Sequence, residues 1–306
     1  MLRYALRRLG QAIPTLVAVS LLTFAMIRLI PGDPAVLIAG EEATPEMLRG
    51  IREQLALDRP LLEQYLAYAG GLARGDLGTS IRSKQPVSVE LASRIPATVE
   101  LALAALGILA VAGVLLGVAA AVWRDRWPDH LVRILSLVGV STPAFWVGIM
   151  LVLLFAIHLR LLPVSGRGAL AYLLLPAATA SMDGIALVAR LVRASLLEVL
   201  DEDYVRTGRA KGLGEGRVIW SHALRNALIP TVTVLGLELG RLLGGVVVVE
   251  SVFGWPGFGR LLVTAIQTRD YPLVQSAILV LGTTLVVLNL LVDLSLGLLD
   301  PRIRYR

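Results

Sequence analysis

ATVELALAALGILAVAGVLLGVAAAV, residues 97–122, is apolar throughout except for Thr98 and Glu100 near its start. It is longer than the roughly 20 residues that an α-helix needs to cross a hydrocarbon layer. Its apolar residues are continuous, whereas the strands of a membrane barrel alternate. The whole chain has a mean hydropathy of +0.74 and only 17% charged residues. The sequence therefore predicts an integral membrane protein built from helices.

Five further stretches meet the same length criterion, which gives an all-α membrane protein with about six transmembrane helices. They are Leu9–Ile30, Leu131–Ile157, Ala169–Leu197, Ala227–Val249 and Leu273–Leu299. Four prolines lie inside or at the ends of these spans, namely Pro14, Pro143, Pro176 and Pro230. We expect kinks there rather than breaks, because neighbouring helices can satisfy the backbone groups that proline frees.

The basic residues of the short loops predict the orientation of the chain. One side carries Arg3, Arg7, Arg8, Arg124, Arg126, Arg206, Arg209, Lys211, Arg217, Arg225, Arg302, Arg304 and Arg306. The other side carries only Arg160, Arg167, Arg260 and Arg269 in its short loops. Because positive charge is retained in the cytoplasm, both termini are expected there. The same rule explains the net charge of +6 better than nucleic-acid binding does.

The first span resembles a signal peptide at its start but is expected to stay in the membrane as an anchor. Its apolar run is longer than the central region of a signal peptide, and no small-residue cleavage site follows it. The predicted division of the chain is a transmembrane helix over residues 1–30, an extracytoplasmic segment over 31–96 and a core of five spans over 97–306. A cytoplasmic loop interrupts the core at residues 198–226.

The extracytoplasmic segment is expected to contain amphipathic helices near the outer surface. Thr44 is a candidate N-cap, and Met47, Leu48, Ile51 and Leu55 follow at helical spacing. Two roles are open for this segment. It either packs as a cap over the transmembrane helices or forms a docking surface for a soluble partner.

The sequence lacks the minimum parts of several enzyme sites. Neither Lys84 nor Lys211 stands in a phosphate-binding loop, so the chain is not expected to hydrolyse ATP. The three histidines form no HExxH pair, and GxSxG does not occur. There is no cysteine. We expect no enzyme activity, catalytic residue, metal or cofactor in this chain. His130, His158 and His222 are expected at the surface or at an interface rather than as ligands.

A polar stretch, DYVRTGRAKGLGEGRVIWSHALRNALIP at residues 203–230, separates two apolar spans. Asp203–Lys211 can form a short helix, and Gly212 and Gly214 allow turns. Val218, Ile219 and Leu224 then restore an apolar face. The stretch is either an ordinary basic loop or, as its length and glycines favour, a handle for another protein.

Four ionisable residues lie at membrane depth: Asp183, Glu238, Arg241 and Asp293. Such groups usually face a bundle interior or a watery cavity, because exposure to lipid is costly. Glu238 and Arg241 are three residues apart and can neutralise each other. Asp183 and Asp293 are left to meet either an ammonium group of a substrate or an arginine of another helix. Glu100 and Glu250 are expected at the interface.

Several motifs together resemble one family, the ABC importer permease subunits of the dipeptide, oligopeptide and nickel type. They are LIPGDPA, LALDRPLLEQY, RGDLGTS, RIPATVEL, STPAFWVG, LVRASLLEVLDEDYVRTGRAKGL, VVVESVFGWPGFGRLL, RDYPLVQ and DPRIRY. The general EAA pattern of such loops is absent, since Arg206, Thr207 and Gly208 fill its three positions. Gly208 also replaces an alanine of this family's own version. AAVWRDRWPD and LIAGEEA are further similar to permeases for glutathione, although the substrate stays open among dipeptide, oligopeptide, glutathione and nickel.

The resemblance implies a type I ABC importer architecture in the plasma membrane of a bacterium. The polar stretch would be the coupling helix, which transmits the motion of a cytoplasmic ATPase to the translocation path. The residues implied in this contact are Arg206, Gly208, Arg209, Ala210, Lys211, Gly212, Leu213 and Arg217. The implied partners are a second related permease, two ATPase subunits that bind ATP and Mg, and an extracytoplasmic solute-binding protein.

The outer loop ESVFGWPGFGR, residues 250–260, has two interpretations. Phe253, Trp255 and Phe258, with Pro256 between them, suit an aromatic anchor at the membrane interface. The resemblance instead implies a gate over the outer mouth of the path that meets the binding protein. An alternative for the whole chain is a secondary transporter that works alone on an ion gradient, but no inverted repeat supports it. A membrane scaffold is a third reading.

Overall fold

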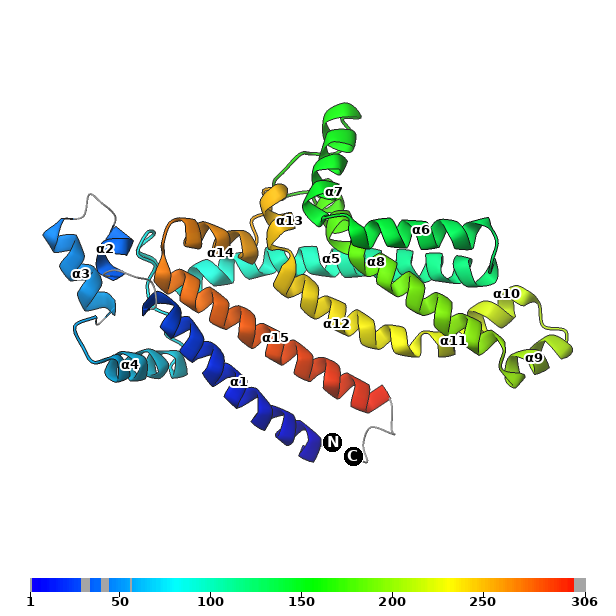
Figure 1. The fold of residues 1–306 in the computed structure, drawn as a ribbon, viewed down its shortest axis with the longest axis horizontal. Helices are drawn as coiled ribbons and strands as arrows, with labels where there is room; N and C mark the ends of the chain where they lie inside the picture. The colour runs from blue at the N-terminus through cyan, green and yellow to red at the C-terminus, as the bar shows by residue number, and fades with distance from the viewer. Residues whose placement is uncertain (1, 29–33, 40–43, 56, 300–306) are drawn as a thin grey trace. The chain divides into compact units, whose positions relative to one another are not determined.

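The computed structural model describes residues 2–28, 34–39, 44–55 and 57–299, drawn in Figure 1. Every regular element in these ranges is a helix, apart from an isolated bridge between Thr79 and Pro86. The predicted all-α class is confirmed. The chain forms two compact units, Met1–Pro96 with Gly257–Arg306, and Ala97–Pro256. Each is described by itself below.

The first unit contains two long helices that lie side by side in Figure 1, α1 and α15. Its elements are α1 (Leu2–Arg28), α2 (Pro34–Ala39), α3 (Pro45–Leu55), α4 (Leu61–Ala73), the start of α5 (Val87–Val122), α14 (Phe258–Gln267) and α15 (Tyr271–Leu299). Close contact is possible at Gly282 of α15, where an added Cβ would lie 3.2 Å from Val19 of α1. A small residue at this position therefore lets the two backbones approach.

Helices α3 and α4 form within the segment for which amphipathic helices are predicted. Thr44 caps α3 as expected, since its Oγ1 accepts a hydrogen bond from the Met47 amide at 3.3 Å. Helix α4 packs on α1 through an aromatic group in which Phe24 meets Tyr65 edge-on at 5.3 Å and stacks on Tyr68 at 5.9 Å. Helix α4 therefore covers part of the apolar helix α1, and the cap and docking interpretations of the whole segment both stay predictions.

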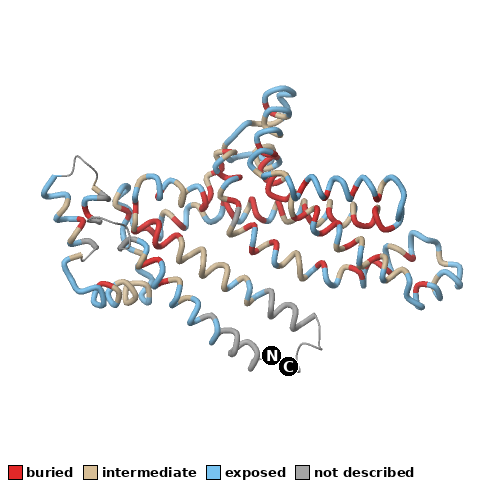
Figure 2. Tube along the Cα trace, in the orientation of Figure 1, coloured by how far each residue is buried: buried red, intermediate tan, exposed pale blue. Residues whose placement is uncertain are grey.

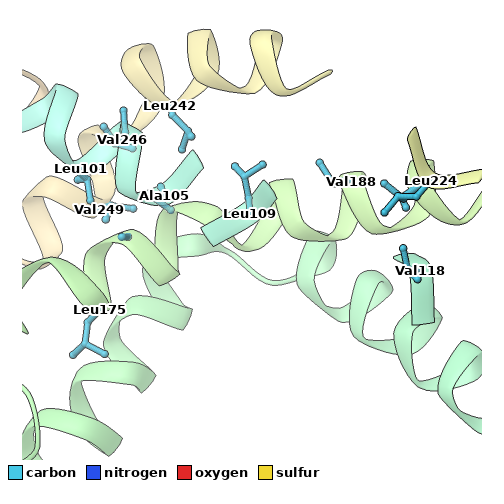
Figure 3. Close-up of a cluster of buried hydrophobic side chains, with 14 of the residues drawn as sticks. Leu101, Ala105, Leu109, Val118, Leu175, Val188, Leu224, Leu242, Val246 and Val249 are labelled. Carbon is cyan, nitrogen blue, oxygen red and sulfur yellow. The ribbon is translucent and has the colours of Figure 1, made fainter. Parts of the chain in front are cut away.

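The second unit is arranged around the long helix α8 (Leu170–Leu200). The other elements are α5 from Ala97 onward, α6 (Trp127–Ser141), α7 (Ala144–Leu151) with a π-helical continuation (Val152–His158), α9 (Asp203–Ala210), α10 (Glu215–Arg217), a π-helical turn (Val218–Ala223), α11 (Leu224–Ala227), α12 (Ile229–Gly245) and α13 (Val247–Val252). Figure 3 shows its buried cluster, in which Leu109 and Val188 come from α5 and α8, and Leu242 from α12.

Two glycines allow α5 to approach α8 closely. An added Cβ at Gly113 would lie 2.7 Å from Val188, and one at Gly117 would lie 2.7 Å from both Val192 and the Ala189 carbonyl oxygen. Their spacing, one helical turn apart, is the small-residue pattern by which membrane helices pack. Helix association in lipid depends on such contacts because apolar burial alone gives little preference for protein over lipid tails.

We expect Gly117→Ala to destabilise the second unit, because the new methyl group overlaps backbone as well as side chain. Overpacking of this kind costs about 1–3 kcal/mol. The measurement is the thermal stability of the purified protein in detergent. Gly107→Ala is the matched control on the same helix, since an added Cβ there meets nothing within 4 Å. Equal stability of the two variants would contradict the close contact.

Two of the predicted spans are not continuous helices. Residues Leu131–Ile157 were expected as one span, but α6 and α7 meet at an angle of 107°. Thr142 and Pro143 are extended at the break, with ψ angles of 126° and 132°. The prediction of a kink at Pro143 is therefore wrong, since the helix ends there. The ring of a proline disfavours the helical conformation for the residue before it, here Thr142. Pro14 and Pro176, in contrast, lie inside continuous helices.

The fifth predicted span, Ala227–Val249, is also divided. The helical segments before and after Leu228 are bent by 56°, and α12 ends at Gly245 before α13 begins. Among the described residues, three helices are long and apolar enough to cross a membrane, or up to five if each bent pair counts as one span. The described apolar part of α1, Ile13–Met26, falls short of this length.

Candidate functional site

The polar stretch after α8 forms a short helix, α9. One side of this helix packs against the other helices of the second unit. Helix α9 covers Asp203–Ala210, as predicted to within one residue. Val205 is 1% exposed and belongs to the same buried cluster as Leu196 of α8 and Val218. The Asn226 amide also donates a hydrogen bond to the Tyr204 hydroxyl at 2.7 Å. A force on α9 would therefore reach both α8 and α11.

The outer side of this stretch is basic and exposed. Figure 2 shows α9 and its surroundings mostly in the colour of exposed residues. The exposed members of the predicted coupling set are Arg206, Arg209, Ala210, Lys211, Gly212 and Arg217. Two of these have acidic neighbours, since Arg209 lies 2.8 Å from Glu215 and Arg206 lies 3.6 Å from Asp203. Leu213 is half-buried against the cluster of its own unit, and Gly208 lies beside it.

One backbone position in the stretch requires glycine. Gly212 has a φ of +80° and lies in the turn that follows α9. Glycine adopts this conformation readily, whereas residues with a Cβ adopt it at a cost. Gly214 was expected to share this role, but its φ of −64° is open to any residue. The turn therefore depends on Gly212 alone.

The membrane-depth charges of the second unit form one cluster between α8 and α12. Arg241 Nε lies 2.8 Å from Glu238 Oε2, and Arg241 Nη1 lies 3.9 Å from Asp183 Oδ2. The predicted pairing of Glu238 with Arg241 is present, and Asp183 has an arginine of another helix as its neighbour. Gly184 makes space for this arrangement, because an added Cβ would lie 3.1 Å from Glu238 Oε2.

Exposure differs among these charges. Glu238 is buried, whereas the side chains of Asp183 and Arg241 are 48% and 43% exposed. The cluster thus presents one carboxylate and one guanidinium side by side on an accessible surface. Asp293 lies in α15 at a position whose side chain is outside the described residues.

The aromatic residues of the outer loop are buried. Phe253 and Trp255 are each 1% exposed, and the Trp255 indole Nε1 donates to the Ala97 carbonyl at 2.8 Å. The anchor interpretation is wrong for these two rings, because they face the interior of the second unit instead of a membrane interface. Phe258 is the first residue of α14 and is buried with Val87 in the first unit. Pro256 is half-buried.

Polar contacts that were not predicted fix this loop to the part of α5 that follows Ala97. Glu250 was expected at the interface, but it is fully buried, and its carboxylate accepts a hydrogen bond from the Thr98 hydroxyl at 2.6 Å. Glu100 pairs with Arg167 at 2.6 Å, and the Arg167 guanidinium lies 5.9 Å from the centre of the Trp255 ring. The sequence places these residues far apart, so no local pattern indicates the contacts.

A second charged cluster was also missed. Asp129, at the first turn of α6, is fully buried between Arg133 of the same helix and Arg193 of α8. The spacing of Asp129 and Arg133 is a recognisable helical ion pair, but nothing local points to Arg193. Among the described residues no group of three or more potential metal ligands occurs, and the three histidines are exposed as expected.

Comparison with known proteins shows which family has this combination of apolar spans and a basic segment. Residues 113–305 match the family described as binding-protein-dependent transport system inner membrane component, and residues 1–102 match the N-terminal region of that membrane component. The chain belongs to this family. It is an inner-membrane permease subunit of an ABC transporter and is not an enzyme.

Several full-length relatives are named as glutathione transport permeases. The chain is similar to the glutathione transport system permease proteins GsiC of Escherichia coli O6:H1 and Salmonella paratyphi A, each 45% identical over 306 residues and covered completely on both sides. The corresponding protein of Escherichia coli K12 is 44% identical over the same length. The predicted resemblance to peptide importer permeases is confirmed.

Proposed function

We propose that this chain is the permease subunit of an ATP-driven importer for glutathione and small peptides of related chemistry. The observation that carries the proposal is the 45% identity along the entire chain with permeases named for glutathione transport. The proposed partners are a second related permease, two ATPase subunits that hold ATP and Mg, and an extracytoplasmic binding protein.

In this proposal the segment 203–217 couples the ATPase to the permease. Its inner face is fixed by Val205 and Tyr204, while its outer face offers basic groups to a partner. Arg206, Arg209, Lys211 and Arg217 would make charge-assisted contacts to acidic groups of the ATPase. Ala210, which is exposed and small, would allow close approach. Leu213 and Gly208 would support the segment from its inner side.

The cluster of Asp183, Glu238 and Arg241 is proposed to lie on the translocation path. A glutathione molecule carries an ammonium group and carboxylates, and the cluster exposes a carboxylate and a guanidinium next to each other. Asp183 would meet the ammonium group and Arg241 a carboxylate. Glu238, which is buried, would hold the Arg241 side chain in position. Asp293 stays a candidate of the path on sequence grounds.

Asp183→Asn is expected to raise the KM for glutathione uptake about tenfold, the effect of losing one charge-assisted contact. Protein levels should be unchanged, because Asp183 is half-exposed and its distance to Arg241 is long. Uptake kinetics in cells that lack their own glutathione importer measure this. Asp201→Asn, which removes an exposed carboxylate just after α8, is the matched control. An unchanged KM would remove Asp183 from the path.

Partner binding gives a direct test of the proposed assembly. The tagged chain should co-purify with two copies of an ATP-hydrolysing subunit and one copy of a second permease. A secondary transporter would instead purify alone and catalyse ion-driven uptake in liposomes. Isolation without any ATPase, together with uptake driven by an ion gradient, would contradict the proposal.

A further inference from the structure

Asp129 is a fully buried charge in the second unit. It lies at the end of α6 that the distribution of basic residues predicts to face the cytoplasm. Its carboxylate is 0% exposed. Arg193 donates from Nε at 2.7 Å and from Nη2 at 2.8 Å, and Arg133 donates at 3.0 and 2.5 Å. The Asp125 amide adds a further hydrogen bond at 3.0 Å. A buried carboxylate is tolerated only with partners of this kind.

The Asp129–Arg193 pair joins two helices that otherwise have few polar attachments to each other. The buried face of α6 consists of Asp129, Val132, Ser136 and Gly139. The last three are small or apolar, and apolar contact gives membrane helices little reason to prefer each other over lipid. The opposite face of α6 is exposed and apolar, with Leu137 at 68%. The bidentate contact is therefore the strongest directional link between α6 and α8.

The position of Arg193 connects this link with the coupling segment. Arg193 lies on α8, which ends at Leu200 and leads directly into α9. Val205 of α9 packs in one cluster with Leu196, one turn beyond Arg193. A displacement of α9 would therefore be passed to the part of α8 that carries Arg193, the partner of Asp129. Helix α6 continues into α7 after the break at Thr142.

We propose that Asp129 and Arg193 form a joint that makes α6 follow α8 when the coupling segment is displaced, with Arg133 holding the carboxylate in place. The proposal rests on the proposed function of segment 203–217. It assigns a positioning role to these residues, which act through the helices α6 and α8. Arginine suits this role because its planar fork holds a carboxylate at two points, which lysine cannot do.

The first test follows the distance between α6 and α8. The chain has no cysteine, so cysteines introduced at Leu137 and Leu187, both exposed, are the only ones in this subunit, and cysteines of the partner subunits are replaced before spin labelling. In the assembled transporter the distance should have one narrow distribution, with and without ATP. Asp129→Asn should broaden it in the ATP-bound state. Asp201→Asn is the control, because it removes an exposed carboxylate just after α8 and outside the Asp129 cluster.

The second test measures coupling. In proteoliposomes that contain the whole transporter, Asp129→Asn should lower the uptake of labelled glutathione per ATP hydrolysed about tenfold, as expected for one lost charge-assisted contact. Arg193→Lys should be intermediate. In an Asp129→Cys/Arg193→Cys double variant, a bifunctional methanethiosulfonate linker should restore coupling, and its reductive removal should abolish the gain.

The outcomes separate this proposal from the function on which it rests. If the unaltered transporter hydrolyses ATP but does not take up glutathione, the proposed substrate is wrong, and the distance measurement, which needs no substrate, still tests the joint. If Asp129→Asn does not accumulate in the membrane, the test of the joint is whether the linker restores coupling in the Asp129→Cys/Arg193→Cys variant. A narrow distance in Asp129→Asn, or a linker that fails to restore coupling, would overturn the joint.

Discussion

Gly212→Val should abolish most ATP-driven uptake while the protein accumulates in the membrane at its normal level. Gly212 has a φ of +80°, and a Cβ there meets nothing within 4 Å. The cost of the substitution is therefore in the backbone, about 1–2 kcal/mol for a left-handed L-residue and more for a β-branched one. The turn after α9 would change shape to avoid this cost. Membrane insertion depends on the apolar spans and should be unaffected.

A graded series distinguishes shape from bulk. Gly212→Asn should retain most uptake, since asparagine tolerates positive φ, and Gly212→Ala should be intermediate. Gly214→Val is the matched control, because Gly214 has an ordinary φ and the same open surroundings. The measurements are uptake and ATP hydrolysis by the assembled transporter. Equal uptake by Gly212→Val and Gly214→Val would show that the turn at Gly212 is not required for coupling.

Trp255→Ala should have the largest effect on folding among the substitutions considered. The ring is 1% exposed, and its indole donates to the Ala97 carbonyl. Truncation of a buried tryptophan costs about 3–5 kcal/mol. It also leaves the Ala97 oxygen without this donor. We expect a strongly lowered melting temperature in detergent and reduced membrane levels.

Two variants control for this loss. Trp220→Ala removes an exposed indole, 51% accessible, and should leave stability unchanged. Trp255→Phe keeps most of the ring but removes the donor, so its effect should be smaller than that of alanine. If Trp255→Ala is as stable as the parent and impairs only stimulation by the binding protein, the loop acts as the gate that the family resemblance implies.

Elements with a local signal were predictable from the sequence. Long apolar runs predicted α5 and α8, the candidate cap Thr44 predicted α3, and the basic stretch that ends at Gly212 predicted α9. Pairing across the chain has no such signal. Glu250 was expected at an interface because only its place in the span was visible, whereas the Thr98 hydroxyl that donates to it lies on a helix far away in the sequence.

The bends show a second limit. A proline can kink a helix or end it, and the outcome depends on which groups surround it. Pro176 lies inside α8, while Pro143 follows an extended Thr142 at a 107° break. Both prolines stand in apolar sequence, so hydropathy treats them alike. The charged clusters around Asp129 and Arg241 likewise depend on an α8 neighbour, Arg193 or Asp183, that the spacing along one helix does not reveal.

The measurement that tests the central claim most directly is uptake of labelled glutathione into proteoliposomes. They would contain this chain, its second permease and its ATPases, with the binding protein supplied outside and ATP inside. The proposal predicts uptake that requires ATP and the binding protein and that does not change when ion gradients are collapsed. Uptake by this chain alone, without ATP and driven by an ion gradient, would contradict it.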